Sequence, residues 1–176
     1  GRYPAKTVAD VATFVDKIIQ YETDPEYGLW RQRVTLVADD AARPEPVHGS
    51  IATGKSHTQN SETIAGLVAP GIEIRKLYMM EFPEVSNASL YGVVKPDATQ
   101  ALLDILTEGT AIINYIGHGS AHQWAQERLL YQDNDLNSIQ TENKLPLWIA
   151  GTCSWGHFDK IETEAFSEEV IRMENN

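Results

Sequence analysis

We predict an α/β fold in which a mostly parallel β-sheet is covered by helices on both faces. Short apolar runs of strand length recur along the chain, and segments with helical periodicity or helix-boundary residues separate them. When strands and helices alternate in this way, each helix carries the chain across the sheet to a further parallel strand. The expected strands are residues 34–38, 73–78, 111–116 and 145–153, and the expected helices are residues 7–21, 56–68, 96–109 and 162–173.

The first helix, expected over residues 7–21, has both a start signal and a regular apolar pattern. The Thr7 hydroxyl can accept a hydrogen bond from the backbone near Asp10, and an acidic residue in the first turn suits the positive end of the helix dipole. Apolar residues then recur at helical spacing, so we expect one face of this helix to pack against another part of the molecule. These residues are Val8, Val11, Ala12, Val15, Ile18 and Ile19.

The middle of the chain contains regular and irregular segments. Residues 41–55 are rich in alanine, proline and glycine without any period, which favours a surface loop. Residues 79–94 are polar and aperiodic, which in a compact domain favours a binding or functional loop. Pro96 near the start and Gly109 at the end delimit the third helix, and a turn with a short helix is expected within residues 133–143.

Two of the expected strands end at chemically reactive residues. The run 111–116 leads into Gly117-His118-Gly119-Ser120, and the run 145–153 ends at the single cysteine, Cys153. Glycines beside the histidine let the backbone turn sharply and approach a ligand closely. Because ligands bind outside the carboxyl ends of parallel strands, neighbouring strands would carry His118 and Cys153 to the same edge of the sheet.

The overall composition limits the classes of protein to consider. The chain has 176 residues, of which 42% are hydrophobic and 22% charged, which fits one globular domain over residues 1–176. Both ends of the sequence adjoin helix signals, so we expect this domain to be truncated. The net charge of -11 opposes a general attraction to nucleic acid or anionic membranes. No run approaches the roughly 20 apolar residues that cross a bilayer, and one cysteine cannot form an internal disulfide.

A cysteine and a histidine at one sheet edge are suited to acyl transfer through a thioester. The thiol becomes a strong nucleophile as a thiolate, and an imidazole can take its proton and later protonate the leaving amine. The oxyanion also needs hydrogen-bond donors. The backbone N–H groups of Gly119 and Cys153 are the candidates for this oxyanion hole.

Both residues also have a non-catalytic interpretation. A lone cysteine at a strand end is often a small buried hydrophobic residue, and a histidine between glycines can belong to a turn or an anion-binding loop. The other histidines match no compact zinc pattern and there is no second cysteine, so we expect no catalytic metal. These histidines are His48, His57, His122 and His157.

Several further residues are candidates for the surroundings of the site. Asp39 and Asp40 follow the strand 34–38 and are compatible with orienting the histidine, binding substrate, holding a structural calcium ion, or simple solvation. Glu62 is a further candidate to orient the histidine. Trp124 and Trp155 follow the two reactive strand ends, where they either wall a substrate pocket or pack in the core.

A set of short motifs is spread over nearly the whole chain. The motifs are Gly1-Arg2-x-Pro4, Val15-Asp16-Lys17-Ile18-Ile19-x-Tyr21-Glu22, Val37-Ala38-Asp39-Asp40, Asn114-Tyr115-x-Gly117-His118-Gly119-Ser120, Trp124-Ala125-x-Glu127, and Cys153 followed by Phe158-Asp159. Together they resemble the gingipain family of cysteine peptidases. The resemblance implies a caspase-like α/β domain with His118 and Cys153 as the catalytic dyad and Gly119 in the oxyanion hole. It further implies protein or peptide substrates, no cofactor, and a secreted or cell-surface location.

Within this family, two segments most resemble the sortases of the type IX secretion system. These segments are Ala38-Asp39-Asp40 and Trp124-Ala125-x-Glu127-Arg128. Such sortases act at the extracellular face of the outer membrane with other secretion components, remove the C-terminal signal domain of secreted proteins, and join the new end to a lipopolysaccharide amine. A rival hypothesis is a non-catalytic scaffold or binding subunit of a cell-surface complex that has kept the fold. The family's domain extends beyond both ends of this sequence.

Overall fold

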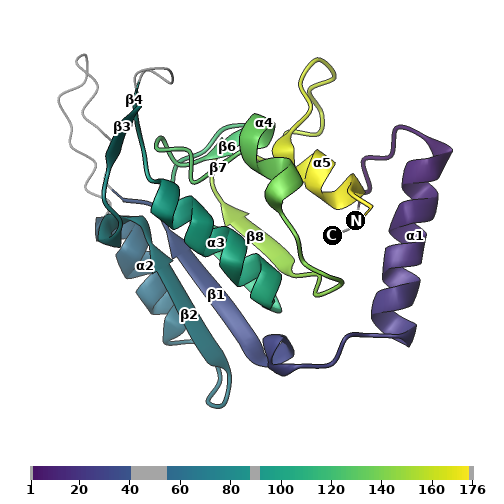
Figure 1. The fold of residues 1–176 in the computed structure, drawn as a ribbon, viewed down its shortest axis with the longest axis horizontal. Helices are drawn as coiled ribbons and strands as arrows, with labels where there is room; N and C mark the ends of the chain where they lie inside the picture. The colour runs from purple at the N-terminus through teal and green to yellow at the C-terminus, as the bar shows by residue number, and fades with distance from the viewer. Residues whose placement is uncertain (1, 41–54, 88–91, 175–176) are drawn as a thin grey trace.

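The computed structural model describes residues 2–40, 55–87 and 92–174, and within these residues it contains a four-stranded sheet in the order β2-β1-β5-β8 (Figure 1). The strands of this sheet are β1 (Arg33–Ala38), β2 (Glu73–Tyr78), β5 (Ile112–Ile116) and β8 (Leu147–Gly151). The helices are α1 (Val8–Thr23), α2 (Lys55–Ala65), α3 (Pro96–Glu108), α4 (Gln132–Asp135) and α5 (Phe166–Arg172). Two small antiparallel pairs join β3 (Val85–Asn87) to β4 (Gly92–Val94) and β6 (Gln123–Trp124) to β7 (Leu130–Tyr131).

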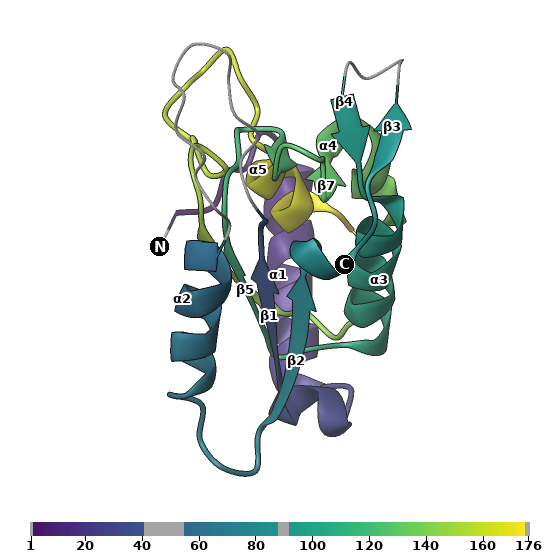
Figure 2. The same ribbon diagram turned by 90° about the vertical axis from the view of Figure 1, so that its left-hand side faces the viewer.

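The three strand pairings of the main sheet are all parallel, as the sequence predicts. The chain passes from β1 through α2 to β2, then returns through α3 to β5 on the other side of β1. Figure 2 shows α2 on one face of the sheet and α3 on the opposite face. The predicted α/β class is therefore confirmed. The strand order reverses between β1 and β5, and their carboxyl ends form the crevice where parallel sheets bind ligands.

Most of the core lies on the α3 face of the sheet. Leu102 and Leu106 of α3 and Ile113 and Tyr115 of β5 are fully or almost fully buried there. The ring of Tyr115 stacks on Trp124 with 4.3 Å between ring centroids and 7° between ring planes. On the opposite face, α2 packs on β1 and β5.

The helix α1 confirms the predicted start signal but not the predicted packing. Thr7 and Asp10 form a capping box, in which the Thr7 hydroxyl accepts from the Asp10 N–H group and the Asp10 carboxylate accepts from the Thr7 N–H group. No residue of α1 is buried, and Val8 is 87% exposed. Figure 1 shows α1 standing apart from the sheet. Residues of α1, β8 and α5 line a cavity of about 670 Å³.

Several boundaries differ from the sequence-based expectation. The segment 79–94, expected as an aperiodic loop, contains a 3₁₀ turn at Met79–Glu81 and the strands β3 and β4. The closing helix, expected to begin at residue 162, begins at Phe166. The expected loop 41–55 lies outside the described residues apart from Lys55, where α2 begins. The strands β6 and β7 were not predicted. Among the described helices, none combines the length and apolar character needed to cross a membrane.

Candidate active site

The backbone of His118 is held by three hydrogen bonds just beyond the end of β5. Its N–H group donates to Asp39 Oδ2 at 2.8 Å, and its carbonyl accepts from the Tyr115 hydroxyl at 2.6 Å and from the Ala125 N–H group at 2.9 Å. Asp39 reaches this position because Ala38 of β1 pairs with Ile116 of β5. The register of the two strands therefore fixes the place of the histidine backbone.

The glycines on either side of His118 allow the chain to approach its neighbours closely. A Cβ atom on Gly117 would lie 2.2 Å from Asp39 Cβ and 2.5 Å from the Tyr115 hydroxyl oxygen. A Cβ atom on Gly119 would lie 2.4 Å from Thr152 Oγ1. Side chains at these positions would force the segments apart, so glycine is needed at both. Gly119 also brings the histidine turn against the residue that precedes Cys153.

Cys153 follows β8 in the same way as His118 follows β5. Ile116 pairs with Gly151, so each of the two reactive residues stands two positions beyond a paired strand end. The thiol of Cys153 is free, and the residue is exposed. The structure therefore brings His118 and Cys153 to adjacent strand ends at one edge of the sheet.

The ring of His118 lies on the α2 side of the sheet. In β5, Ile113 and Tyr115 point into the core on the α3 side, and the ring of His118 contacts His57 of α2, on the other side. In β8, Trp148 packs against the core while Leu147 and Ile149 are exposed. Because side chains alternate along a strand, Leu147 and Ile149 face away from the core, up to the end of β8 at Gly151.

Burial dominates the electrostatics of the residues that hold the histidine backbone. Asp39 is 2% exposed, and this burial raises the pKa of its carboxyl, although the N–H bonds from His118 and Asp40 favour the charged form. Burial also raises the pKa of the Tyr115 hydroxyl, with a further contribution from the charge of Asp39. Tyr115 therefore stays protonated and remains a hydrogen-bond donor.

The other carboxylates expected to orient His118 are engaged elsewhere. Asp40 forms an ion pair with the buried ammonium group of Lys95. Glu62 accepts hydrogen bonds at its carboxylate from Lys76 at 2.8 Å and from the Tyr78 hydroxyl at 2.7 Å. Asp39, as described above, bonds the backbone of His118. The contact that the structure gives for the His118 ring is instead with His57.

One group of carboxylates is compact enough to hold a cation. The ligand oxygens of Asp39, Asp40 and Glu127 all lie within 4.8 Å of one another. Lys95, whose exposure is 3%, already contributes a positive charge to this group through Asp40 and also donates to the Met79 carbonyl at 2.7 Å. One positive charge from this chain therefore offsets part of the negative charge of the three carboxylates.

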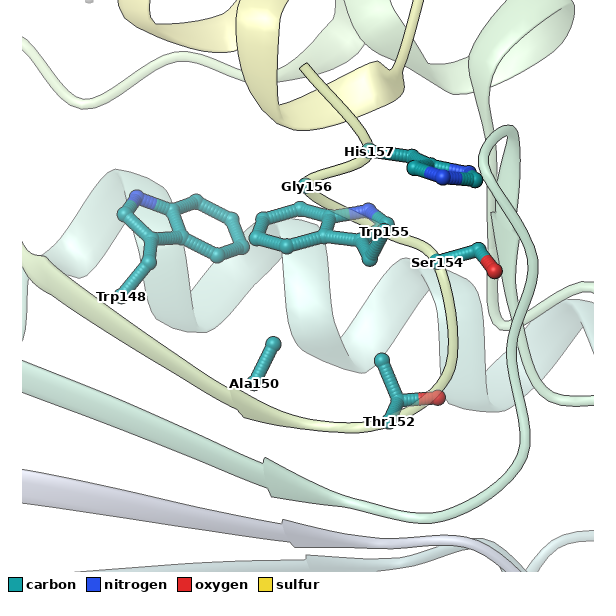
Figure 3. A pocket seen from close by; sticks show the side chains of 7 residues that line it. All are labelled: Trp148, Ala150, Thr152, Ser154, Trp155, Gly156 and His157. Atoms are coloured by element: carbon teal, nitrogen blue, oxygen red, sulfur yellow. The ribbon is translucent and has the colours of Figure 1, made fainter. Parts of the chain in front are cut away.

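The two tryptophans both belong to the hydrophobic core, and Trp155 also lines a cavity. Trp124 is fully buried, with its ring against Tyr115 and its centroid 5.0 Å from that of the Trp155 ring. Trp155 lines a cavity of about 530 Å³ beside the Cys153 loop, together with Trp148 and Thr152 (Figure 3). Trp148 belongs to the core-facing series of β8, so this cavity opens on the α3 side of the strand. Cys153 itself is absent from its lining.

His57 was considered in the sequence only as a metal ligand, and the structure places it beside His118. The ring centroids of the two histidines are 5.2 Å apart and their planes meet at 81°, an edge-to-face contact. No motif or spacing links residue 57 to the Gly-His-Gly turn. Its proximity arises from the packing of α2 on β1 and β5.

Comparison with known proteins identifies the family to which this chain belongs. The family model of peptidase family C25 matches residues 1–176. Gingipain R2 of Porphyromonas gingivalis is 21% identical over 178 residues, and the match covers 100% of this chain and 21% of that protein. Gingipain R1 of the same organism is also 21% identical, and the match covers 100% of this chain and 16% of that protein.

Two solved structures share the fold. The crystal structure of the Arg-specific cysteine proteinase gingipain R, RgpB, has a TM-score of 0.67 and 22% identity, and the match covers 96% of this chain and 34% of that chain. The complex of the Porphyromonas gingivalis RgpB pro- and mature domains has a TM-score of 0.68 and 22% identity, and the match covers 96% of this chain and 35% of that chain. This chain thus spans about a third of the solved chains and has the gingipain-like, caspase-like fold.

Proposed function

This chain belongs to peptidase family C25, and on that premise we propose that it carries the catalytic dyad of a cysteine peptidase, with Cys153 as nucleophile and His118 as general acid and base. One observation above all supports this assignment. The two residues stand at equivalent positions, each two residues beyond the paired ends of the adjacent strands β5 and β8. The exposed thiol is accessible to a polypeptide substrate, while the backbone of the histidine is held in place.

The reaction proceeds by acyl transfer through a thioester. The His118 imidazole takes the thiol proton, the sulfur attacks the substrate carbonyl carbon, and a tetrahedral oxyanion forms. The N–H groups of Gly119 and Cys153 are the proposed donors to this oxyanion. The imidazolium then protonates the leaving amine as the C–N bond breaks, which leaves the acyl group on sulfur. Water or a second amine resolves the thioester.

The finer proposal is a sortase similar to PorU of the type IX secretion system. The resemblance of the Asp39-Asp40 and Trp124-Ala125 segments supports it. Such an enzyme would act on secreted proteins at the outer-membrane surface, with secretion components as partners and a lipopolysaccharide amine as acceptor. The proposed chemistry needs no cofactor and no nucleic acid. A structural calcium ion at Asp39 and Asp40 remains a prediction, supported by the compact carboxylate group there.

The decisive experiment incubates the full-length protein with candidate secreted substrates, with and without an amine nucleophile, and identifies the product termini by mass spectrometry. Cys153→Ala and His118→Ala should abolish product formation, and Ser154→Ala, a change at an exposed neighbour, serves as the matched control. Undiminished cleavage by Cys153→Ala would overturn the peptidase assignment in favour of a scaffold. Amine adducts support the sortase, whereas hydrolysed ends alone, even with amine present, contradict it.

A further inference from the structure

We propose that His57 is a positioning residue that fixes the ring of His118 in its reactive orientation. This inference rests on the proposed function, because it assigns the missing third member of the His118 and Cys153 site. Catalytic bases in such sites are oriented by a third group, which in many enzymes is a carboxylate or amide. Here the third group is a second imidazole, supplied by α2.

The contact between the two rings is direct. Their centroids are 5.2 Å apart at 81°, within the range in which aromatic rings prefer an edge-to-face arrangement. His118 Nε2 and His57 Nδ1 are both buried and have no hydrogen-bond partner among the described residues. The Nε2 atom therefore gives the His118 ring no anchoring hydrogen bond, and this ring packs against the ring of His57.

The hydrogen bonds described above for His118 act on its backbone and not on its side chain. The N–H and carbonyl groups of His118 are bonded to Asp39 and Tyr115, but neither bond restrains rotation about the side-chain torsions. The glycines at positions 117 and 119 provide no side chains that could flank the ring. A fixed neighbour on the α2 side is thus required to select one rotamer.

The helix α2 is anchored well enough to provide that neighbour. Ser61 of α2 is fully buried. Glu62 of the same helix binds Lys76 and the Tyr78 hydroxyl on β2, with bonds of 2.8 and 2.7 Å. These contacts tie α2 to the strands and hold His57 over the carboxyl end of β5. Glu62, expected from the sequence to orient the histidine directly, contributes here by holding the helix.

The test compares His57→Ala with His57→Phe in the full-length protein. The free energy of an edge-to-face ring pair is of the same order as the change in activation free energy that alters a rate tenfold. His57→Ala removes this ring pair, so it should lower kcat about tenfold with KM unchanged. His57→Phe keeps a ring that can pack edge-to-face, so it should restore most of the lost kcat. His122→Ala, which removes an exposed histidine from the turn after the Gly-His-Gly segment, is the matched control and should retain wild-type kcat.

Each outcome separates the inference from the proposed function. Full activity of His57→Ala, or equal loss in His57→Ala and His57→Phe, overturns the positioning role, while inactive Cys153→Ala and His118→Ala still support the dyad. Activity that survives Cys153→Ala overturns the dyad itself.

A spectroscopic measurement keeps the inference testable if His57→Ala fails to fold. The ring-proton signals of His118 are then recorded by NMR in Cys153→Ala, with and without the additional change His57→Asn, which removes the ring but keeps a polar side chain. A single orientation of the His118 ring beside His57, and averaging between rotamers in the His57→Asn protein, support His57 as the cause of the ring position. The same behaviour of the His118 ring in both proteins overturns the positioning role.

Discussion

The strand ends that carry His118 and Cys153 are built differently, although they lie side by side. β5 pairs with β1 and β8, and the residue two positions beyond it is bonded to a buried carboxylate and a buried tyrosine. β8 pairs with β5 alone among the described strands, and the residue two positions beyond it is exposed. The backbone of His118 is therefore held by the fold, whereas the Cys153 thiol stands at its surface.

This difference matches the different demands of the two proposed catalytic roles. A general base must keep a fixed geometry, while a nucleophile must be reachable by the backbone of a polypeptide substrate. Substitutions at the β5 end should therefore lower both stability and activity. Substitutions at the β8 end should lower activity alone.

The largest loss of stability is expected for Asp39→Ala. The change leaves the N–H groups of His118 and Asp40 without their acceptor, so the free energy of unfolding should fall by about 2–4 kcal/mol. Denaturant unfolding followed by circular dichroism measures it. Glu62→Ala removes an exposed carboxylate and should change stability far less. Equal losses in the two variants would contradict the special role of the β5 end.

Gly119→Ala should have the next largest effect. The new Cβ atom would lie 2.4 Å from Thr152 Oγ1 and 3.0 Å from the Gln123 carbonyl oxygen, so the two strand ends must separate. We expect a loss of about 1–3 kcal/mol in the free energy of unfolding, together with reduced activity. Combining it with Thr152→Ala should recover part of both. Additive losses in the double variant would show that the Thr152 contact is unimportant.

The charge of Asp39 should produce a defined pH dependence of stability. Burial raises its folded-state pKa above 3.8, so folding favours its protonated form. The stabilisation that this pKa shift adds is thus fully present below pH 3.8 and is lost as the pH rises through the raised pKa. The free energy of unfolding of the wild type, relative to that of Asp39→Asn, should be greatest at acid pH and should decrease toward neutral pH. Unfolding curves at a series of pH values measure this difference. A wild type that gains stability relative to Asp39→Asn as the pH rises would contradict a raised pKa of Asp39.

The smallest effect on stability is expected for Cys153→Ala. The residue is exposed, so the free energy of unfolding should stay within about 0.5 kcal/mol of the wild type. Thermal and denaturant unfolding test this, with loss of activity measured on the same preparation. A loss comparable to that of Asp39→Ala would mean that both strand ends are built alike.

The main sheet could be predicted because its strands are continuous apolar runs and its helices carry boundary signals. Thr7 caps α1, and Gly109, at φ 95°, ends α3 in the left-handed region that favours glycine. The small pairs β3–β4 and β6–β7 were missed. Their strands are three and two residues long, and such short strands depend on tertiary context more than on local pattern.

The site was predictable where it follows directly from the strands. His118 and Cys153 could be placed because each follows an apolar run, and parallel strands bring such positions together. The bond from His118 to Asp39 depends on the register between β1 and β5, which no local pattern specifies. The contact with His57 depends on how α2 packs across the sheet. Both contacts depend on the tertiary structure, which the spacing of residues in the sequence does not specify.

The capping box of α1 has a consequence for the dynamics of the chain. This helix is closed at its start by Thr7 and Asp10, yet it buries none of its residues. Its backbone bonds therefore depend on local structure, whereas those of β1 and β5 lie at the centre of the sheet. In amide hydrogen exchange, α1 should exchange through local opening, while the central amides of β1 and β5 should exchange only when the whole chain unfolds.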